Sequence, residues 1–171
     1  MDKGEKGVCQ EELYNKLFKA YAHELYKYLY YKYGEDNNPH DIVQEAFIKL
    51  WNNCANVFPE KARAFLYTVA NNQMINDLAR KKTVLKYQNE DHKTHSNETP
   101  AYVMEENEYR DQLKAALESL SEDQRSTLMM HRVEGMKLRE IAEILGISQK
   151  AVEKRIYTAI AHLKEKLGVF K

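Results

Sequence analysis

A short stretch near the end of the chain carries five polar side chains at helical spacing. They are Gln149, Lys150, Glu153, Lys154 and Tyr157. Residues three and four apart share one side of a helix, so all five would project together. Amide, ammonium, carboxylate and phenol groups in this arrangement are suited to hydrogen bonds with the edges of nucleic-acid bases. This face is the first candidate for function.

Two short helices and a tight turn must hold this face in place. Ile141, Ala142 and Leu145 predict a first helix, and Gly146, which lacks a Cβ, suits the left-handed residue that ends it. Ser148 is the expected cap of the last helix. Two helices joined by a glycine-containing turn are typical of a helix-turn-helix, whose second helix enters the major groove.

We call the side of the last helix that carries Gln149, Lys150, Glu153, Lys154 and Tyr157 the recognition face. Cations beside it would add affinity for DNA without reading its sequence. Arg139, Arg155 and Lys164 are placed for phosphate contacts. A helical hairpin of this spacing also occurs in proteins that bind no DNA, so the remainder of the chain has to support the interpretation.

Histidines and cysteines are the other groups that could do chemistry. The six histidines are scattered, at positions 23, 40, 92, 95, 131 and 162. Cys9 and Cys54 are too few and too far apart for a disulfide framework or a zinc site, so we expect ordinary thiols. No glycine-rich phosphate loop occurs. We expect no metal, no cofactor and no catalysis, with a metal or thiol enzyme as one alternative.

Composition favours helices and argues against a membrane protein. The chain has 171 residues, 43% apolar and 30% charged, with only 6 Gly and 3 Pro. Its apolar runs are too short for a membrane span, and its polar start lacks a signal-peptide core. We therefore expect a cytoplasmic, all-α protein without direct membrane insertion.

Net charge is zero, but the charges are unevenly distributed. Residues 61–86 carry six basic residues against one acidic residue, whereas residues 87–123 carry ten acidic residues against three basic ones. Residues 148–171 are basic again, with six against two. Two basic blocks flanking an acidic middle suit two DNA-facing surfaces, although chance scatter on solvated helices is the alternative.

The apolar pattern divides the chain into two small helical domains. We predict a first domain over residues 1–87, a flexible acidic linker over 88–108 and a helix-turn-helix domain over 109–171. The first domain should contain a helix over about 10–33, another from the expected cap Asn38 to Trp51, a loop over 52–61 and a third helix to about Lys82. The second domain should contain four helices.

The second helix has a buried stripe and a polar outer row. The stripe consists of Ile42, Val43, Ala46, Phe47, Leu50 and Trp51. The outer row consists of Asp41, Gln44, Glu45, Ile48 and Lys49. A face of this kind can bind a partner or simply face solvent.

Three segments, in this order, resemble the extracytoplasmic-function (ECF) sigma factors, small members of the sigma-70 family that initiate bacterial transcription. They are HDIVQEAFIKLW (40–51), ARAFLYTVANNQMINDLARKK (62–82) and LREIAEILGISQKAVEKRIYTAIAHLKEKL (138–167). The sequences of the segments TVANNQ and QKAVEKRI look most like variants common in Bacteroidetes. The resemblance covers residues from about 13 to 167 and implies sigma region 2 and region 4 domains joined by a linker.

The resemblance also implies partners and sites. The outer row of the second helix would bind the β′ clamp helices of core RNA polymerase, region 4 would meet the β flap and the minus-35 element, and an anti-sigma factor would restrain the protein. No small-molecule substrate is implied. The minus-10 residues would be Asn52, Asn53, Asn56, Phe58, Lys61, Arg63, Asn71, Asn72, Arg80, Lys81 and Lys82. Loop residues 52–60 would take up an unstacked base, although asparagines also occur in loops for turn reasons.

This sequence departs from the usual family pattern at several positions. Asn71 stands where an Arg is frequent, Asn76 where an Asp is, and Ala79 precedes a single Arg80. Lys150 and Ala151 replace a frequent Gly-Thr. Promoter preference could therefore differ from that of other members. A stand-alone helix-turn-helix regulator, binding its operator without polymerase, is the second alternative.

Overall fold

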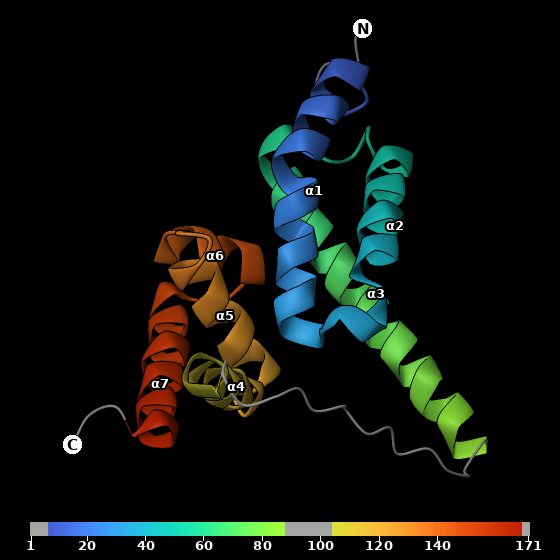
Figure 1. Ribbon diagram of the computed structural model, residues 1–171. Coiled ribbons are helices and arrows are strands. Elements are labelled where there is room, and N and C mark those ends of the chain that lie inside the picture. Colours follow the sequence, from blue (N-terminus) through green and yellow to red (C-terminus); the bar gives the residue numbers. More distant parts are fainter. Residues whose placement is uncertain (1–6, 88–103, 169–171) are drawn as a thin grey trace, which may run out of the picture.

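The computed structural model describes residues 7–87 and 104–168 (Figure 1). Over those ranges the chain is helical and contains no strand, which confirms the all-α prediction. The elements are α1 (Glu11–Tyr33), η1 (Glu35–Asn37), α2 (Pro39–Asn52), α3 (Pro59–Tyr87), α4 (Met104–Glu118), α5 (Glu122–Arg132), α6 (Leu138–Leu145) and α7 (Gln149–Leu167).

Helices α1, α2 and α3 form the first unit, each with an apolar stripe turned toward a shared core. Leu25 and Leu29 of α1, Leu50 of α2, and Leu66 and Met74 of α3 are fully buried. Repeats of three and four residues keep each stripe on one face, and burying each large side chain contributes about 1.5–3 kcal/mol. The core thereby fixes which faces of α2 and α3 remain exposed.

Trp51, which we expected in this core, and Ile75 both lie at the surface. Trp51 is 45% exposed, with its ring edge-on to Tyr14 at 5.0 Å between centroids, and Ile75 is 50% exposed. Trp51 stands in the last turn of α2, and the second half of α3 runs past its neighbours (Figure 1). A helical period shows which side a residue faces, but not where the neighbouring element ends.

Asn38 directly precedes α2, but it does not act as the side-chain cap that we predicted. Its side chain makes no capping hydrogen bond, so the predicted side-chain cap was wrong. The residue adopts a left-handed conformation, with φ 50° and ψ 57°, and its carbonyl oxygen accepts from the amide of Asp41 at 3.1 Å. Asparagine tolerates this conformation better than most residues, which explains its place at the turn.

Helices α4 to α7 form the second unit, in the predicted number. Ser121 and Gln124 form a capping box at the start of α5, and the expected cap Ser148 accepts from the amide of Ala151 at the start of α7. Gly146 ends α6 with φ 65°, where a side chain would be strained. Helix α4 begins at Met104, within the predicted linker; residues 88–103 of that linker, with His92 and His95, lie outside the described residues.

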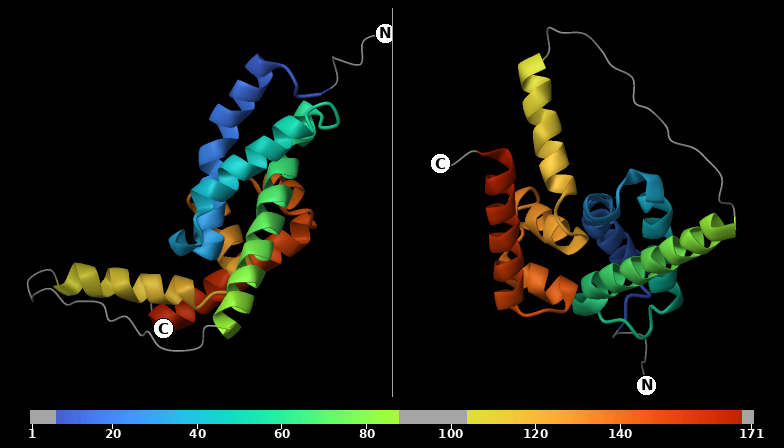
Figure 2. Two further views of the ribbon diagram at one scale, coloured as in Figure 1. Left: turned by 90° about the vertical axis from the view of Figure 1, so that its right-hand side faces the viewer. Right: turned by 90° about the horizontal axis from the view of Figure 1, so that it is seen from below.

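The two units pack against one another, an arrangement that the sequence had left open. Helix α1 lies beside α5, and the start of α3 lies beside α6 (Figure 2). The buried residues of both units join in one apolar cluster, which includes Met74 and Met136. In the part of the chain that is described, no helix is both long and apolar enough to cross a membrane.

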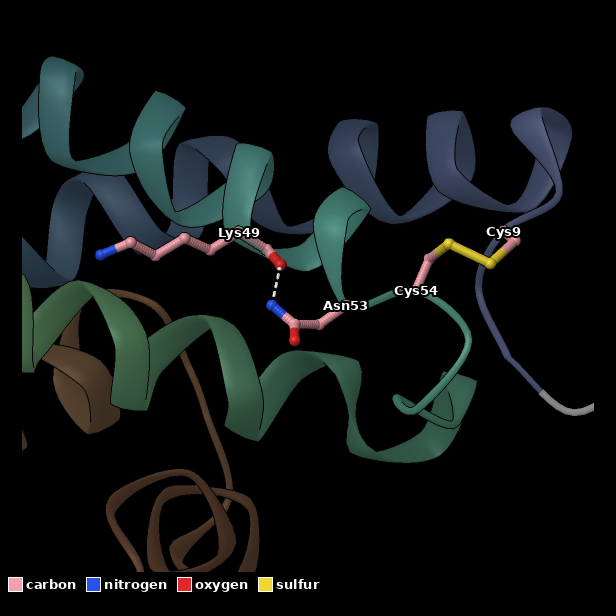
Figure 3. The surroundings of a disulfide bond; sticks show 4 residues. All are labelled: Cys9, Lys49, Asn53 and Cys54. Carbon is pink, nitrogen blue, oxygen red and sulfur yellow. Dashed lines mark hydrogen bonds between the residues drawn. A yellow bond between two sulfur atoms is a disulfide. The ribbon is translucent and has the colours of Figure 1, made fainter.

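Cys9 and Cys54 form a disulfide, so the prediction of two free thiols was wrong (Figure 3). The amide of Val8 donates to the carbonyl oxygen of Cys54 at 2.9 Å, and the two Cα atoms are 4.8 Å apart. The 45-residue separation along the chain concealed this proximity, which arises when the segment before α1 packs on the loop between α2 and α3.

Candidate DNA and polymerase interfaces

The predicted recognition face on α7 is exposed. Gln149, Lys150, Glu153, Lys154 and Tyr157 all face solvent, and Tyr157 is 77% exposed. The opposite side of the helix buries Val152, Ile156 and Ala159. Packing on one side therefore leaves the five polar groups together on the other, as their spacing predicted.

Hydrogen bonds along the helices preorganise part of this surface. The Gln149 amide donates to the Glu153 carboxylate at 3.2 Å, and Arg139 on α6 forms an ion pair with Glu143 at 3.3 Å. Both pairs are exposed and span one helical turn, so each contributes only a few tenths of a kcal/mol. Such weak pairs can exchange for contacts with DNA.

Arg155, predicted to contact phosphate, is engaged within the protein. Its guanidinium lies 3.1 Å from a carboxylate oxygen of Asp123 on α5. The other oxygen of Asp123 lies 3.0 Å from Lys32 of α1. One carboxylate therefore connects the recognition helix to the first unit. Burial, followed by the charge of Asp123, raises the pKa of the nearby Tyr28 hydroxyl well above its ordinary value.

Arg63, predicted to face the minus-10 element, is also held inside the molecule. It makes two hydrogen bonds of 2.8 Å to Glu24 on α1 and lies 3.8 Å from Glu140 on α6. Its guanidinium stands over the Tyr21 ring at 5.5 Å. Burial lowers the pKa of Arg63, but hydrogen bonding and charge from Glu24 outweigh burial, so the pKa is raised overall.

Asn71 and Asn72 have different environments. The Asn71 amide oxygen accepts from Tyr33 at 2.6 Å, Lys32 at 3.0 Å and Tyr28 at 3.3 Å. Asn72 is exposed. The Asn71 side chain thus acts as an acceptor that joins α3 to α1, whereas of the two asparagines only Asn72 presents its amide to solvent.

The cationic side chains of α3 lie mostly in its exposed second half. Arg80, Lys81 and Lys82 are exposed, as is Lys61 in the first turn. Lys81 donates to the Asn37 side chain at 3.1 Å and to a backbone carbonyl at 3.3 Å. Arg80 and Lys82 therefore have the greater freedom to reach a phosphate.

The loop between α2 and α3 presents its predicted residues outward. Asn52, Asn53, Asn56 and Phe58 are exposed, with Phe58 at 46%, while Val57 is buried beneath them. The Asn53 amide donates to the backbone carbonyl of Lys49 at 2.8 Å (Figure 3). The loop is shorter than predicted, because α2 continues through Asn52 and α3 begins at Pro59.

On α2, the predicted polymerase face is largely exposed. Asp41, Gln44 and Ile48 face solvent, with Ile48 at 52%, and Glu45 is half-buried. Lys49 turns toward α3 and donates to Gln73 at 2.7 Å. An apolar side chain among acidic and amide groups gives this face both contact area and charge.

The contacts between the two units were missed by the sequence analysis. Lys27 forms an ion pair with Glu134 at 3.0 Å, and Tyr31 donates to the same carboxylate at 3.2 Å. Arg125 donates to the backbone carbonyls of Tyr31 at 2.6 Å and Lys32 at 2.8 Å. Burial, with the charge of Glu134 next in importance, raises the pKa of Tyr31. These partners lie about a hundred residues apart, so no local pattern could reveal them.

The fold and these surfaces define a two-unit helical protein with a helix-turn-helix. The Sigma-70 region 2 family model matches residues 17–84, and the Sigma-70 region 4 model matches residues 110–163. Together the two models match well over half of the chain. The chain belongs to the sigma-70 family, and its curated relatives include ECF sigma factors.

Several curated relatives align along most of the chain. The ECF RNA polymerase sigma factor SigE of Mycolicibacterium smegmatis is 23% identical over 91% of this chain, which spans 62% of that protein. The RNA polymerase sigma factor YlaC of Bacillus subtilis is 27% identical, with 88% of this chain and 90% of YlaC covered. SigL of Mycobacterium tuberculosis is 26% identical, with 95% and 94% covered.

Two solved structures share the fold. The sigma factor RpoE of Bartonella quintana, solved with the anti-sigma factor NepR, gives a TM-score of 0.64 at 18% identity, covering 95% of this chain and all of that one. CnrH, solved with the cytosolic domain of CnrY, gives a TM-score of 0.62 at 22% identity, covering 95% of this chain and 92% of that one.

Membership of the sigma-70 family makes this chain an alternative sigma factor, which directs promoter recognition in transcription initiation.

Proposed function

We propose that α7 reads the minus-35 element while the loop 53–58 and α3 bind and melt the minus-10 element. The observation that carries this assignment is the exposed recognition face of α7, with Lys150 and Lys154 beside Gln149 and Tyr157. Side chains of these types can reach base edges in the major groove. The protein itself breaks no covalent bond, because the polymerase carries out the chemistry.

At the minus-10 element, the exposed loop supplies amides and a ring for an extruded base. The candidates are Asn52 at the end of α2 and Asn53, Asn56 and Phe58 of the loop, while Arg80 and Lys82, toward the far end of α3, would hold the DNA backbone farther along. Flipping a base costs a few kcal/mol, which stacking on Phe58 and hydrogen bonds from the asparagine amides would offset.

The exposed side of α2 would dock on the β′ clamp helices of core polymerase. Asp41, Gln44 and Glu45 provide polar contacts, and Ile48 provides apolar area. The region 4 unit would bind the β flap. Binding two elements through one polymerase makes the second DNA contact effectively intramolecular, which raises the overall affinity.

Promoter binding requires the two units, which pack against one another in a compact arrangement, to separate. Arg63 and Arg155, both proposed to reach DNA, are engaged with Glu24 and Asp123 respectively. These ion pairs have to break before the arginines contact phosphate. An anti-sigma factor that stabilises this packed arrangement would block promoter use, and the solved complex of RpoE with the anti-sigma factor NepR supports a partner of this class.

A transcription assay tests this proposal directly. Purified protein would be mixed with core polymerase and fragmented genomic DNA from the source organism, and transcript 5′ ends would be mapped. We expect new start sites preceded by two shared blocks about two helical turns apart. Failure of the protein to bind core polymerase or to produce any transcript would overturn it.

Two variants distinguish an effect on polymerase binding from an effect on folding. Glu45→Lys should weaken binding to core polymerase while leaving the helical circular dichroism unchanged. Glu11→Lys, an equal charge change at the exposed start of α1, is the matched control and should bind normally. Normal core affinity of Glu45→Lys would remove α2 from the proposed interface.

A further inference from the structure

The disulfide ties the segment before α1 to the loop proposed to hold the minus-10 base. Val8 is fully buried beside this loop, and its amide bonds to the Cys54 carbonyl at 2.9 Å. Gly7 lies so close that a Cβ there would meet the backbone of Cys54 and Ala55. One covalent bond, one hydrogen bond and close backbone packing therefore hold the loop on one side (Figure 3).

The tie leaves the proposed base-binding side chains accessible. Asn52, Asn53, Asn56 and Phe58 remain exposed while the disulfide is closed. The bond therefore limits the conformations of the loop without covering it. Ordering a binding loop in advance lowers the entropy cost of capturing a ligand.

We propose that Cys9 and Cys54 form a reversible thiol-oxidation site whose disulfide orders the loop 53–58 and increases promoter melting. This inference rests on the proposed role of the loop at the minus-10 element. The oxidised protein is the more active form, and the reduced protein has a more mobile loop and melts promoters less readily.

A hydroperoxide is the class of oxidant that fits. Cys9 is exposed and Cys54 half-buried, so the Cys9 thiolate reacts first. Its sulfur attacks one peroxide oxygen; an S–O bond forms, the O–O bond breaks, and the alkoxide or hydroxide released takes a proton to become alcohol or water. The Cys54 thiolate then attacks the Cys9 sulfur, forming the S–S bond, and the departing hydroxide is protonated to water. The two thiols lose two electrons and two protons, and the peroxide gains them.

A dithiol reverses the reaction. One of its thiolates attacks the exposed Cys9 sulfur, which forms a mixed disulfide and releases Cys54 as a thiolate. The second thiol of the reductant then attacks the reductant sulfur that is bonded to Cys9. This step closes the disulfide of the reductant and releases Cys9 as a thiolate. The reductant ends as a disulfide, and both cysteines end as thiols.

The test compares oxidised and reduced full-length protein after removal of the oxidant or reductant, before core polymerase is added. Open-complex formation would be measured on a double-stranded promoter mapped in the transcription assay, and on the same promoter with a pre-melted minus-10 region. We expect the reduced protein to open the duplex about threefold to tenfold less readily, with a smaller difference on the pre-melted DNA. The double variant Cys9→Ser, Cys54→Ser should match the reduced protein under both treatments.

Two further measurements keep this inference separate from the proposed function. Affinity for core polymerase should be the same in both redox states, and hydrogen exchange of the amides of residues 53–58 should be faster after reduction. Equal promoter opening by the two forms, or greater opening by the reduced form, would overturn the inference. If neither form gives transcripts, the proposed function fails, and unchanged hydrogen exchange would then also exclude the loop-ordering role.

Discussion

Arg155 of the recognition helix and Asp123 of α5 form an ion pair of 3.1 Å, and the second oxygen of Asp123 lies 3.0 Å from Lys32 of α1. A residue proposed to contact promoter phosphate therefore shares its carboxylate partner with the other unit. The compact arrangement and DNA binding compete for the same guanidinium.

Asp123→Asn should loosen the contact between the units and make Arg155 available to DNA. Because the Asp123 side chain is 49% exposed, each ion pair contributes only about 0–1 kcal/mol, so we expect a modest effect. Small-angle scattering should show a larger radius of gyration, and affinity of the isolated protein for a minus-35 duplex should rise. Glu122→Gln, an equal charge change on a neighbouring exposed residue, is the control. An unchanged radius would argue against Asp123 as the connection.

Arg63→Lys should destabilise the protein although the charge is kept. Lysine cannot reproduce the two parallel hydrogen bonds to Glu24, and both side chains are about four-fifths buried. We expect the free energy of unfolding in urea to fall by about 1–2 kcal/mol. Arg80→Lys, in the exposed half of the same helix, should change it by less than about 0.5 kcal/mol. Equal effects of the two variants would contradict a structural role for Arg63.

Lys154→Ala should weaken promoter binding by the holoenzyme. A lost phosphate contact would reduce the slope of log affinity against log salt by about 1, whereas a lost base contact would change sequence preference at one position. Filter binding over a salt series, with wild-type and single-base variants of the minus-35 element, distinguishes these outcomes. Lys166→Ala, an exposed lysine in the last turn of the same helix, is the comparison. Identical behaviour of both variants would contradict the proposal that α7 contacts the minus-35 DNA.

Stability should decrease in alkaline solution. The pKa of Tyr67 and that of Tyr28 are raised above 10.0, first by burial and then by the charges of Glu24 and Asp123 respectively. In the unfolded chain these tyrosines lose their protons near pH 10, whereas in the folded protein they keep them. Their contribution is therefore complete below the unfolded pKa and is lost as the pH rises above it.

Urea unfolding at a series of pH values between about 8 and 11 checks this expectation. Tyr67→Phe removes one of the two hydroxyls, so it should flatten the alkaline decline. It should also lower stability at neutral pH, because Tyr67 donates to Glu24 at 2.7 Å. A decline of the same steepness in Tyr67→Phe would show that Tyr67 is not its source.

Local features of the sequence predicted the helices and the recognition face. Spacing of three and four residues placed Lys150 and Lys154 together on the outward side of the last helix, and Ser148 caps that helix as expected. These signals depend on neighbours within one or two turns. The loop residues and the outer row of α2 were also located well enough to propose their roles.

The sequence by itself determined the helical class, the helix-turn-helix and the family, because periodicity, caps and turn residues act over a few positions. Only the tertiary structure decided that Arg63 and Arg155 are engaged in ion pairs, that the two units share an interface, and that Cys9 and Cys54 are bonded. Those contacts join residues about 30 to 100 positions apart, and their formation depends on how whole helices pack rather than on any local pattern.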